Sequence, residues 1–191
     1  TRKMRFVSEK HSTHVARADA ETSAPVSKAT EAALIGNIKS AVTAANAVVI
    51  ADYALGMLTN NVVRAGSDAA KAGNKPVIVA PRGRDYGRYA SATLIKPNRQ
   101  QLIDVVSHNV DGDADIAVAA EKVRKATNAK AVLVTRSEAG MTLVSGEPPL
   151  HLPAYPVRVR DVSGAGDTVS AALALMLACG ASFEAATRVA N

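Results

Sequence analysis

The sequence predicts an α/β fold, with a mostly parallel sheet, helices on both faces and a small β extension. Helical patterns alternate along the chain with short, continuously apolar strands, as in a parallel sheet that is covered on both sides. The chain has 191 residues, about one domain, and 48% of them are apolar, which is enough for a sizeable core. The single cysteine, Cys179, cannot form an internal disulfide and favours a reducing, cytoplasmic setting.

The chain begins with two extended segments. Residues 2–19 read as two strands joined by a polar turn around residues 9–12, which predicts a β hairpin. The pattern becomes helical over residues 29–45, where one face collects Ala33, Leu34, Ile38, Ala41 and Val42. A short apolar run at residues 47–51 then predicts a buried strand. We therefore expect a hairpin over residues 2–19 and an α/β core over residues 27–191.

The alternation continues toward the C-terminus. The expected helices cover residues 60–72, 98–107, 114–127 and 165–178, and the expected strands cover residues 76–80, 93–96 and 131–135. Two further extended segments, 141–144 and 157–159, flank proline-rich residues and predict an antiparallel edge to the sheet. Ser182 is placed to begin a last helix. The chain starts without methionine and stops inside this helical pattern, so we expect it to be part of a longer, incomplete kinase-sized domain.

Charge and composition narrow the partners. The net charge is +6, but the basic residues are scattered and aromatics make up only 3%, which argues against a nucleic-acid surface and favours a small anionic substrate. The longest apolar run, residues 171–179, is too short to cross a bilayer, and no signal sequence precedes it, so we expect a soluble protein. The histidines are dispersed, and no metal-ligand set is predicted.

The most informative motif lies at residues 161–168, where the chain enters an apolar helix. Gly164 and Gly166 let the backbone approach a ligand closely, and the amides of the first helical turn favour an anion. Asp167 would repel a bound phosphate, but it suits a base that accepts a hydroxyl proton as phosphate is attacked. The alternative is that Asp167 only stabilises the helix start and the glycines only turn the chain.

These residues resemble a known family. Gly164-Ala165-Gly166-Asp167 followed by an Ala/Leu helix is similar to the signature of the ribokinase-type (PfkB) carbohydrate kinases. Four further segments appear in the order seen in bacterial heptose-7-phosphate kinases: Asp52–Gly56, Pro81–Tyr89, Lys96–Asn98 and Thr135–Leu143. The resemblance covers nearly the whole chain. It implies a ribokinase-like fold and an ATP- and Mg²⁺-dependent kinase for a sugar or sugar phosphate, heptose 7-phosphate first.

The resemblance also implies a role for each motif. Asp167 is the catalytic base, and the amides of Gly164, Ala165 and Gly166 stabilise the transferring phosphoryl group. The implied nucleotide residues are Asn98, Thr135, Arg136 and Gly140, with Asn98 toward the phosphates and magnesium. The implied acceptor residues are Arg17, Asp19 and Asp52. A protruding hairpin in this family often pairs with a second subunit, which allows a homodimer.

Each implied role has a structural alternative. Asn98 and Gln101 can form a capping box without any ligand, and Arg136 can be an ordinary cation at a strand end. The Arg17 and Asp19 pair can lie on an ordinary surface. Asp52 can simply begin the turn that follows its strand. We expect Tyr86 and Tyr89 to pack in the interior rather than to stack on a base.

Four positions depart from the family pattern. Gln101 stands where relatives carry Glu, Leu55 where they carry Lys, Ala80 where they carry Asp and Ser137 where they carry Gly. Loss of the carboxylate at position 101 weakens the expected hold on magnesium. Two alternatives follow: a nucleotide- or sugar-phosphate-binding protein that has lost transfer, and a PfkB kinase for another acceptor, such as a keto-deoxy sugar acid or a nucleoside. The sequence does not identify the acceptor.

Overall fold

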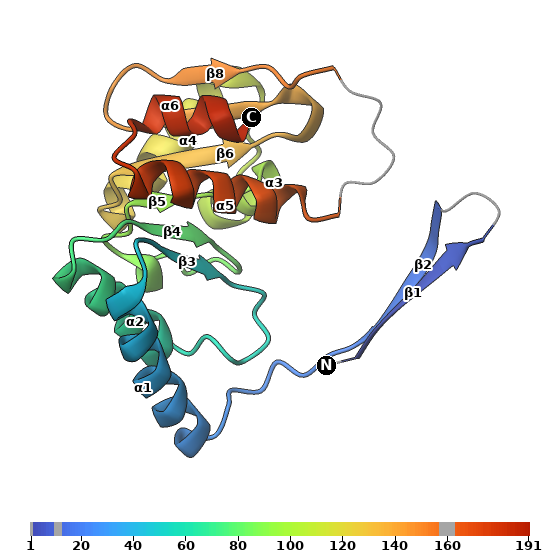
Figure 1. Cartoon of the computed structure of the whole chain (residues 1–191). Coiled ribbons are helices and arrows are strands. Elements are labelled where there is room, and N and C mark those ends of the chain that lie inside the picture. The colour runs from blue at the N-terminus through green and yellow to red at the C-terminus, as the bar shows by residue number, and fades with distance from the viewer. Residues whose placement is uncertain (1, 10–12, 157–162) are drawn as a thin grey trace.

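The computed structural model describes residues 2–9, 13–156 and 163–191. It contains a two-stranded sheet and a six-stranded sheet. The expected strand at residues 157–159, Asp161 and Val162 of the glycine motif and most of the predicted hairpin turn lie outside the described residues. The two sheets separate clearly in Figure 1, where the hairpin stands away from the α/β body.

The hairpin is formed by β1 (Arg2–Ser8) and β2 (Thr13–Ala20), which pair antiparallel, as predicted. Its sequence alternates between two faces because successive side chains of a strand point to opposite sides. Met4 and Phe6 lie opposite Ala18 and Ala16 on an apolar face, whereas Arg5 lies opposite Arg17 on a charged face. The hairpin is thus amphipathic, and its apolar side chains are exposed.

The large sheet has the strand order β3-β4-β5-β6-β7-β8. The parallel part contains β3 (Val48–Ala51), β4 (Val77–Ala80), β5 (Leu94–Ile95) and β6 (Ala131–Thr135). The antiparallel part contains β7 (Met141–Val144) and β8 (Leu150–Leu152). The predicted antiparallel edge is therefore confirmed for β7, and it includes β8 within the proline-rich segment.

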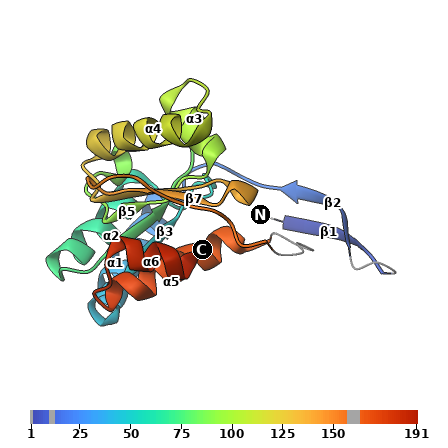
Figure 2. The ribbon, with the colours of Figure 1, turned by 90° about the horizontal axis from the view of Figure 1, so that it is seen from above.

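Helices cover both faces of this sheet, as Figure 2 shows for α3 and α4 on one side and α5 and α6 on the other. The helices are α1 (Lys28–Ala44), α2 (Asn60–Ala72), α3 (Arg99–Val106), α4 (Gly112–Thr127), α5 (Ala165–Ala178) and α6 (Phe183–Ala190), with short 3₁₀ turns at Gly87–Tyr89 and Ser137–Ala139. Their N-caps follow the sequence: Ser27, Thr59, Asn98 and Ser182 each accept a backbone amide. The ribokinase-like layer order predicted from the alternation is present.

Two hydrophobic clusters divide the core by strand alternation. Val77 and Val79 of β4 pack with the α1 to α4 side, whereas Ile78 between them packs with α5 and α6. In the same way Val132 and Val134 belong to the first cluster and Leu133 to the second. Strands buried on both faces read as continuous apolar runs, which is why the sequence located them.

Two expectations about the N-terminal part of the core are wrong. The predicted apolar face of α1 is buried only at Val42, while Ala33 and Ala41 are exposed. The strand β3 was expected to be buried, but Val49 is 43% exposed. Both differences have one cause: among the described residues β3 pairs only with β4, so it is an edge strand, and α1 packs mainly on α2 beyond that edge.

Candidate phosphoryl-transfer site

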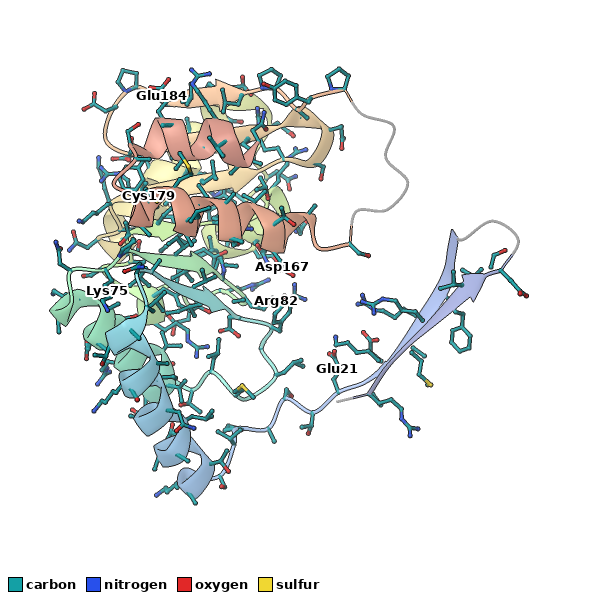
Figure 3. The ribbon with its side chains drawn as sticks, viewed as in Figure 1. Glu21, Lys75, Arg82, Asp167, Cys179 and Glu184 are labelled. Atoms are coloured by element: carbon teal, nitrogen blue, oxygen red, sulfur yellow. The ribbon has the colours of Figure 1, made fainter. Side chains whose placement is uncertain are left out.

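The candidate site lies at the edge of the sheet where the parallel strands end. The carboxyl ends of parallel strands share one edge, so the loops after β3, β4, β5 and β6 meet there. The start of α5 lies at the same edge, and Figure 3 shows Asp167 on the end of α5 nearest the ends of β3 and β4, with Arg82 on the loop after β4. This arrangement brings chemistry-bearing side chains from distant parts of the sequence together.

The glycine motif forms a bare helix N-terminus. Gly164 is the N-cap at φ 80°, in the left-handed region that glycine favours, and it offers no side chain to cap the helix. The first-turn amides of Ala165, Gly166 and Asp167 have no acceptor within the described residues. Unpaired amides at the positive end of a helix favour an anionic ligand. The predicted anion site thus has the local geometry it requires.

Asp167 is exposed on the first turn of α5. Its side chain has one side-chain partner among the described residues: the Tyr53 hydroxyl donates to Oδ1 at 3.2 Å and to Oδ2 at 3.3 Å. Partial burial, this hydrogen bond and the charge of Asp167 raise the pKa of Tyr53, so the phenol remains a donor. A carboxylate that is solvent-accessible and singly held is free to accept a further hydrogen bond from a substrate hydroxyl.

Lys96 brings a buried cation to the same helix start. The side chain follows β5 and is only 6% exposed, and its Nζ lies 3.6 Å from the position that a Cβ on Gly166 would occupy. Its ammonium group has no hydrogen-bond or ion-pair partner in the described part of the chain. Burial lowers the pKa of Lys96, while the charge of Asp167 opposes that shift. A buried, unpaired cation beside bare amides is a place where negative charge is stabilised.

Asp52 is placed differently from the acceptor role that the resemblance implies. The side chain is only 3% exposed and points into the interior. It accepts hydrogen bonds from the Tyr89 hydroxyl at 2.6 Å and from the amide of Ala54 at 2.7 Å, and it lies 3.3 Å from Arg88. Burial, followed by the hydrogen bond to Asp52, raises the pKa of Tyr89. In this arrangement Asp52 anchors the loop after β3, and Tyr86 and Tyr89 pack in the core as predicted.

The residues implied for the nucleotide form one connected group. Asn98 bridges Thr135, whose amide donates to the Pro97 carbonyl at 3.0 Å. The Arg136 amide donates to the Gly140 carbonyl at 2.8 Å. Gly140 requires glycine, because a Cβ there would lie 1.9 Å from the Leu152 carbonyl oxygen, at φ 85°. The fold therefore places these four residues along the edge that leads from Lys96 toward β7.

The side chains in this group are already engaged. Asn98 and Gln101 form the capping box expected of a ligand-free helix start, and the Gln101 amide also donates to the Pro81 carbonyl at 3.0 Å. The Arg136 guanidinium pairs with Asp113 and donates to the Ala139 carbonyl at 2.9 Å. Arg136 therefore shapes its loop in this structure, and its side chain does not extend toward Asp167.

Arg17 and Asp19 lie on the charged face of the hairpin. Their side chains pair with each other at 3.0 Å, and Lys3 lies 3.8 Å from Asp19. This face is directed toward the loop after β3, because the charge of Lys3 acts on Tyr53 and lowers its pKa against the larger opposing effects. Since Arg5 and Arg17 stand directly opposite each other, the face retains repelling positive charges that an anion would relieve.

The described residues do not form a protein-held metal centre. No group of three or more His, Cys, Asp or Glu side chains within residues 2–9, 13–156 and 163–191 could hold an ion. The two residues nearest to the implied magnesium region, Asn98 and Gln101, use their amide groups in the capping box and at Pro81. These side chains do not fit an ion held by the protein alone, so we assign no chemical step to a resident metal.

The departures from the family pattern have local explanations. Gln101 uses its amide N–H toward Pro81, a contact that a Glu side chain cannot make. Ser137, where relatives carry Gly, adopts φ 54° and accepts the strain of a left-handed conformation. Leu55 lines an apolar cavity of about 520 Å³ along β3, together with Ile38 and Leu58. The structure offers no reason for Ala80.

Sequence reasoning missed Tyr53 and Lys96 as site residues. Both were quoted within motifs, Asp52–Gly56 and Lys96–Asn98, but neither received a role. A lysine that directly continues an apolar strand carries a signal, because a buried strand end is an unfavourable place for a charge. Tyr53 carries none of its own, because its contact with Asp167 joins positions that are 114 residues apart.

Comparisons with known protein families and sequences give a consistent answer. The model of the pfkB family carbohydrate kinases matches residues 3–191. The bifunctional protein HldE of Rhodopseudomonas palustris (strain BisA53) is 49% identical over 192 residues, and that of Bradyrhizobium diazoefficiens is 48% identical over 192 residues. In both cases the match covers 100% of this chain but only 39% of the relative.

Solved structures share the fold. A mutant of phosphofructokinase-2 from Escherichia coli matches 97% of this chain and 61% of its own, with a TM-score of 0.81 and 22% identity. The tetrameric inhibited form of the same enzyme has a TM-score of 0.79 at 21% identity, with 97% and 61% covered. Arabidopsis thaliana ribokinase, complexed with ribose and ATP, has a TM-score of 0.66 at 25% identity, with 87% and 51% covered. No helix in the described part of the chain is long and apolar enough to span a membrane.

Proposed function

Because the chain belongs to the pfkB family of carbohydrate kinases, we propose that it forms part of an ATP-dependent kinase that phosphorylates a hydroxyl of heptose 7-phosphate. The observation that carries the proposal is the start of α5. There an exposed carboxylate, bare amides and a buried lysine occupy one place. Phosphoryl transfer depends mainly on positioning and on charge stabilisation, and this combination supplies both.

The reaction assigns a distinct task to each group. Asp167 accepts the proton of the acceptor hydroxyl as its oxygen attacks the γ-phosphorus of ATP. The bond from that phosphorus to the bridging oxygen breaks, and ADP leaves. The amides of Gly164, Ala165 and Gly166, together with the Lys96 ammonium, stabilise the negative charge on the transferring group. Magnesium enters with the nucleotide, where it neutralises phosphate charge.

The nucleotide and the acceptor approach from opposite sides. ATP phosphates lie along the edge formed by Asn98, Thr135 and Gly140, which leads directly from Lys96. The backbone of Arg136 contributes to this edge, while its side chain holds Asp113. The acceptor lies between Asp167 and the charged face of the hairpin, where Arg17, oriented by Asp19, meets the sugar phosphate. The basic excess of the chain suits such a substrate.

The chain spans 39% of the curated relatives that it matches, so the activity is best tested in the complete protein. We expect Asp167→Asn to lower ADP release with heptose 7-phosphate by about 10² to 10⁴ while ATP still binds. Asp68→Asn, which changes an exposed aspartate of α2 outside the site, serves as the matched control and keeps full turnover. Nearly unchanged turnover in Asp167→Asn would show that the assigned base is wrong.

Two alternatives are separated by the same assay. A binding protein that has lost transfer predicts thermal stabilisation by ATP or sugar phosphate without ADP release from any acceptor. The departures at Gln101, Leu55 and Ala80 motivate this alternative. A kinase for another acceptor predicts ADP release with a keto-deoxy sugar acid or a nucleoside but not with the heptose phosphate. A panel of these acceptors therefore distinguishes all three.

We further infer that the apolar face of the hairpin contacts a second copy of the chain. Met4 is 44% exposed and Phe6 is 54% exposed on that face. A two-stranded hairpin alone is marginally stable, so this face needs cover, and a second hairpin offers the same apolar side chains. The tetrameric form of Escherichia coli phosphofructokinase-2 shows that a protein of this fold assembles. Sedimentation velocity should give a dimer that Phe6→Lys dissociates, and a wild-type monomer at micromolar concentration would contradict the inference.

A further inference from the structure

The proposed base is oriented by a single side chain. Asp167 stands on an exposed helical turn, where an aspartate can adopt several rotamers. Among the described residues, only the Tyr53 hydroxyl contacts its carboxylate through a side chain, and it reaches both oxygens, at 3.2 Å and 3.3 Å. A donor shared between the two oxygens fixes the plane of the carboxylate as well as its direction. Tyr53 thus selects one orientation of Asp167 from those that the helix allows.

Tyr53 can impose that orientation because its backbone is firmly held. The preceding residue, Asp52, is buried and bound to Tyr89, Arg88 and the amide of Ala54. Farther along the same loop, the Gly56 carbonyl accepts the amide of Val26 at 3.1 Å. The tyrosine therefore projects from a loop that is anchored on both sides. Its own side chain remains 59% exposed, so its contribution to the hydrophobic core is small.

We propose that Tyr53 is a positioning residue for phosphoryl transfer, which acts by holding the carboxylate of Asp167 in the orientation that receives the acceptor proton. The inference rests on the proposed function, because it assumes that Asp167 is the base. Tyr53 keeps its own proton throughout: the proton of the acceptor hydroxyl passes to Asp167, the new P–O bond forms, and ADP leaves. A base is efficient only within hydrogen-bond reach and correct alignment, so loss of the phenol slows the chemical step.

The decisive variant is Tyr53→Phe in the complete protein, because it removes the hydroxyl and keeps the ring. We expect kcat to fall by about tenfold to a hundredfold, the range for a hydrogen bond to a charged group, while KM for ATP and the thermal midpoint stay unchanged. Tyr155→Phe alters another exposed tyrosine, which has no side-chain partner among the described residues, and it should retain the wild-type kcat.

A double-mutant cycle separates positioning from a general structural effect. If Tyr53 acts through Asp167, adding Tyr53→Phe to Asp167→Asn produces no further loss in the slow residual ADP formation. A structural role would lower the residual rate by the same factor as in the wild type, and that result would overturn the proposal. A kcat for Tyr53→Phe within twofold of wild type, or above it, would also overturn it.

The two proposals fail in distinguishable ways. Turnover that survives Asp167→Asn removes the proposed base and, with it, the positioning role of Tyr53. Turnover that is lost in Asp167→Asn but kept in Tyr53→Phe leaves the base in place and removes only the positioning role. The expected pattern is a severe loss in the first variant, a moderate loss in the second, and no additional loss when they are combined.

Discussion

Two aspartate–tyrosine pairs start from neighbouring residues of one loop and differ in almost every physical respect. Asp52 is buried and accepts the Tyr89 hydroxyl at 2.6 Å, with an amide and Arg88 as additional partners. Asp167 is exposed and holds Tyr53 at 3.2 Å and 3.3 Å, with no other side-chain partner in the described residues. The comparison teaches that a carboxylate with a full set of buried donors stabilises structure, whereas one with a single exposed donor keeps acceptor capacity for a substrate.

The largest effect expected from this comparison is on stability at Asp52. Asp52→Ala removes the acceptor of the Tyr89 hydroxyl and the counter-charge of Arg88, which has a second nitrogen, Nε, buried without a partner among the described residues. We expect the free energy of unfolding to fall by about 3 kcal/mol, because the partners stay behind in a poorly solvated place. Urea denaturation of the complete protein measures it.

The matched control for Asp52 is Asp68→Ala, at an exposed position of α2. This control should change the free energy of unfolding by less than about 0.5 kcal/mol. If Asp52→Ala is as stable as the control and loses only turnover, then Asp52 contacts the acceptor, as the family resemblance implied, and the comparison of the two pairs is broken.

A smaller effect of opposite sign is expected at Lys96. Replacing a buried, unpaired ammonium by an apolar chain of similar length should raise the free energy of unfolding in Lys96→Met by about 1 to 3 kcal/mol. The same change should lower turnover by about 10² to 10³, because the transferring phosphoryl group loses a cation. A variant that is more stable and less active identifies a group kept for function at the expense of stability.

The pH dependence sharpens the test at Lys96. Because burial lowers the pKa of Lys96 in the folded protein below the ordinary value of 10.5, the unfolded chain binds more protons between those two values. Stability of the wild type therefore rises with pH across that window, and the advantage of Lys96→Met shrinks toward pH 10.5. Lys71→Met, at an exposed lysine of α2, should show no such trend. An equal gain at every pH would contradict the assignment of Lys96 as a charged buried group.

Most of the fold could be predicted because each element carries a local signal. The strand at Ala131–Thr135 and the helix at Ala165–Ala178 have the predicted bounds, since a continuous apolar run and a helical repeat are both readable within one element. The edge position of β3 was not readable in this way. Strand order is a property of pairing between distant segments, and the apolar run Val48–Ala51 has the same composition as a central strand.

The candidate site was predictable in its backbone and less so in its side chains. The glycine motif indicated the bare helix start because glycine and an apolar helix are sequence features in themselves. Whether Asp52 points inward or outward, whether Arg136 finds Asp113, and whether Tyr53 reaches Asp167 depend on tertiary packing. Lys96 lies between these cases: its residue type was visible, but its approach to Gly166 required coordinates.

The adjacency of Asp52 and Tyr53 also limits how the loop after β3 can vary in length. Neighbouring residues in extended backbone face opposite ways, so inserting or deleting one residue between β3 and this dipeptide would exchange the two side chains. The tyrosine would then enter the interior and the carboxylate would face the base, adding repulsion where a donor had been. Single-residue length changes at this point should therefore be tolerated less well than most substitutions within β3.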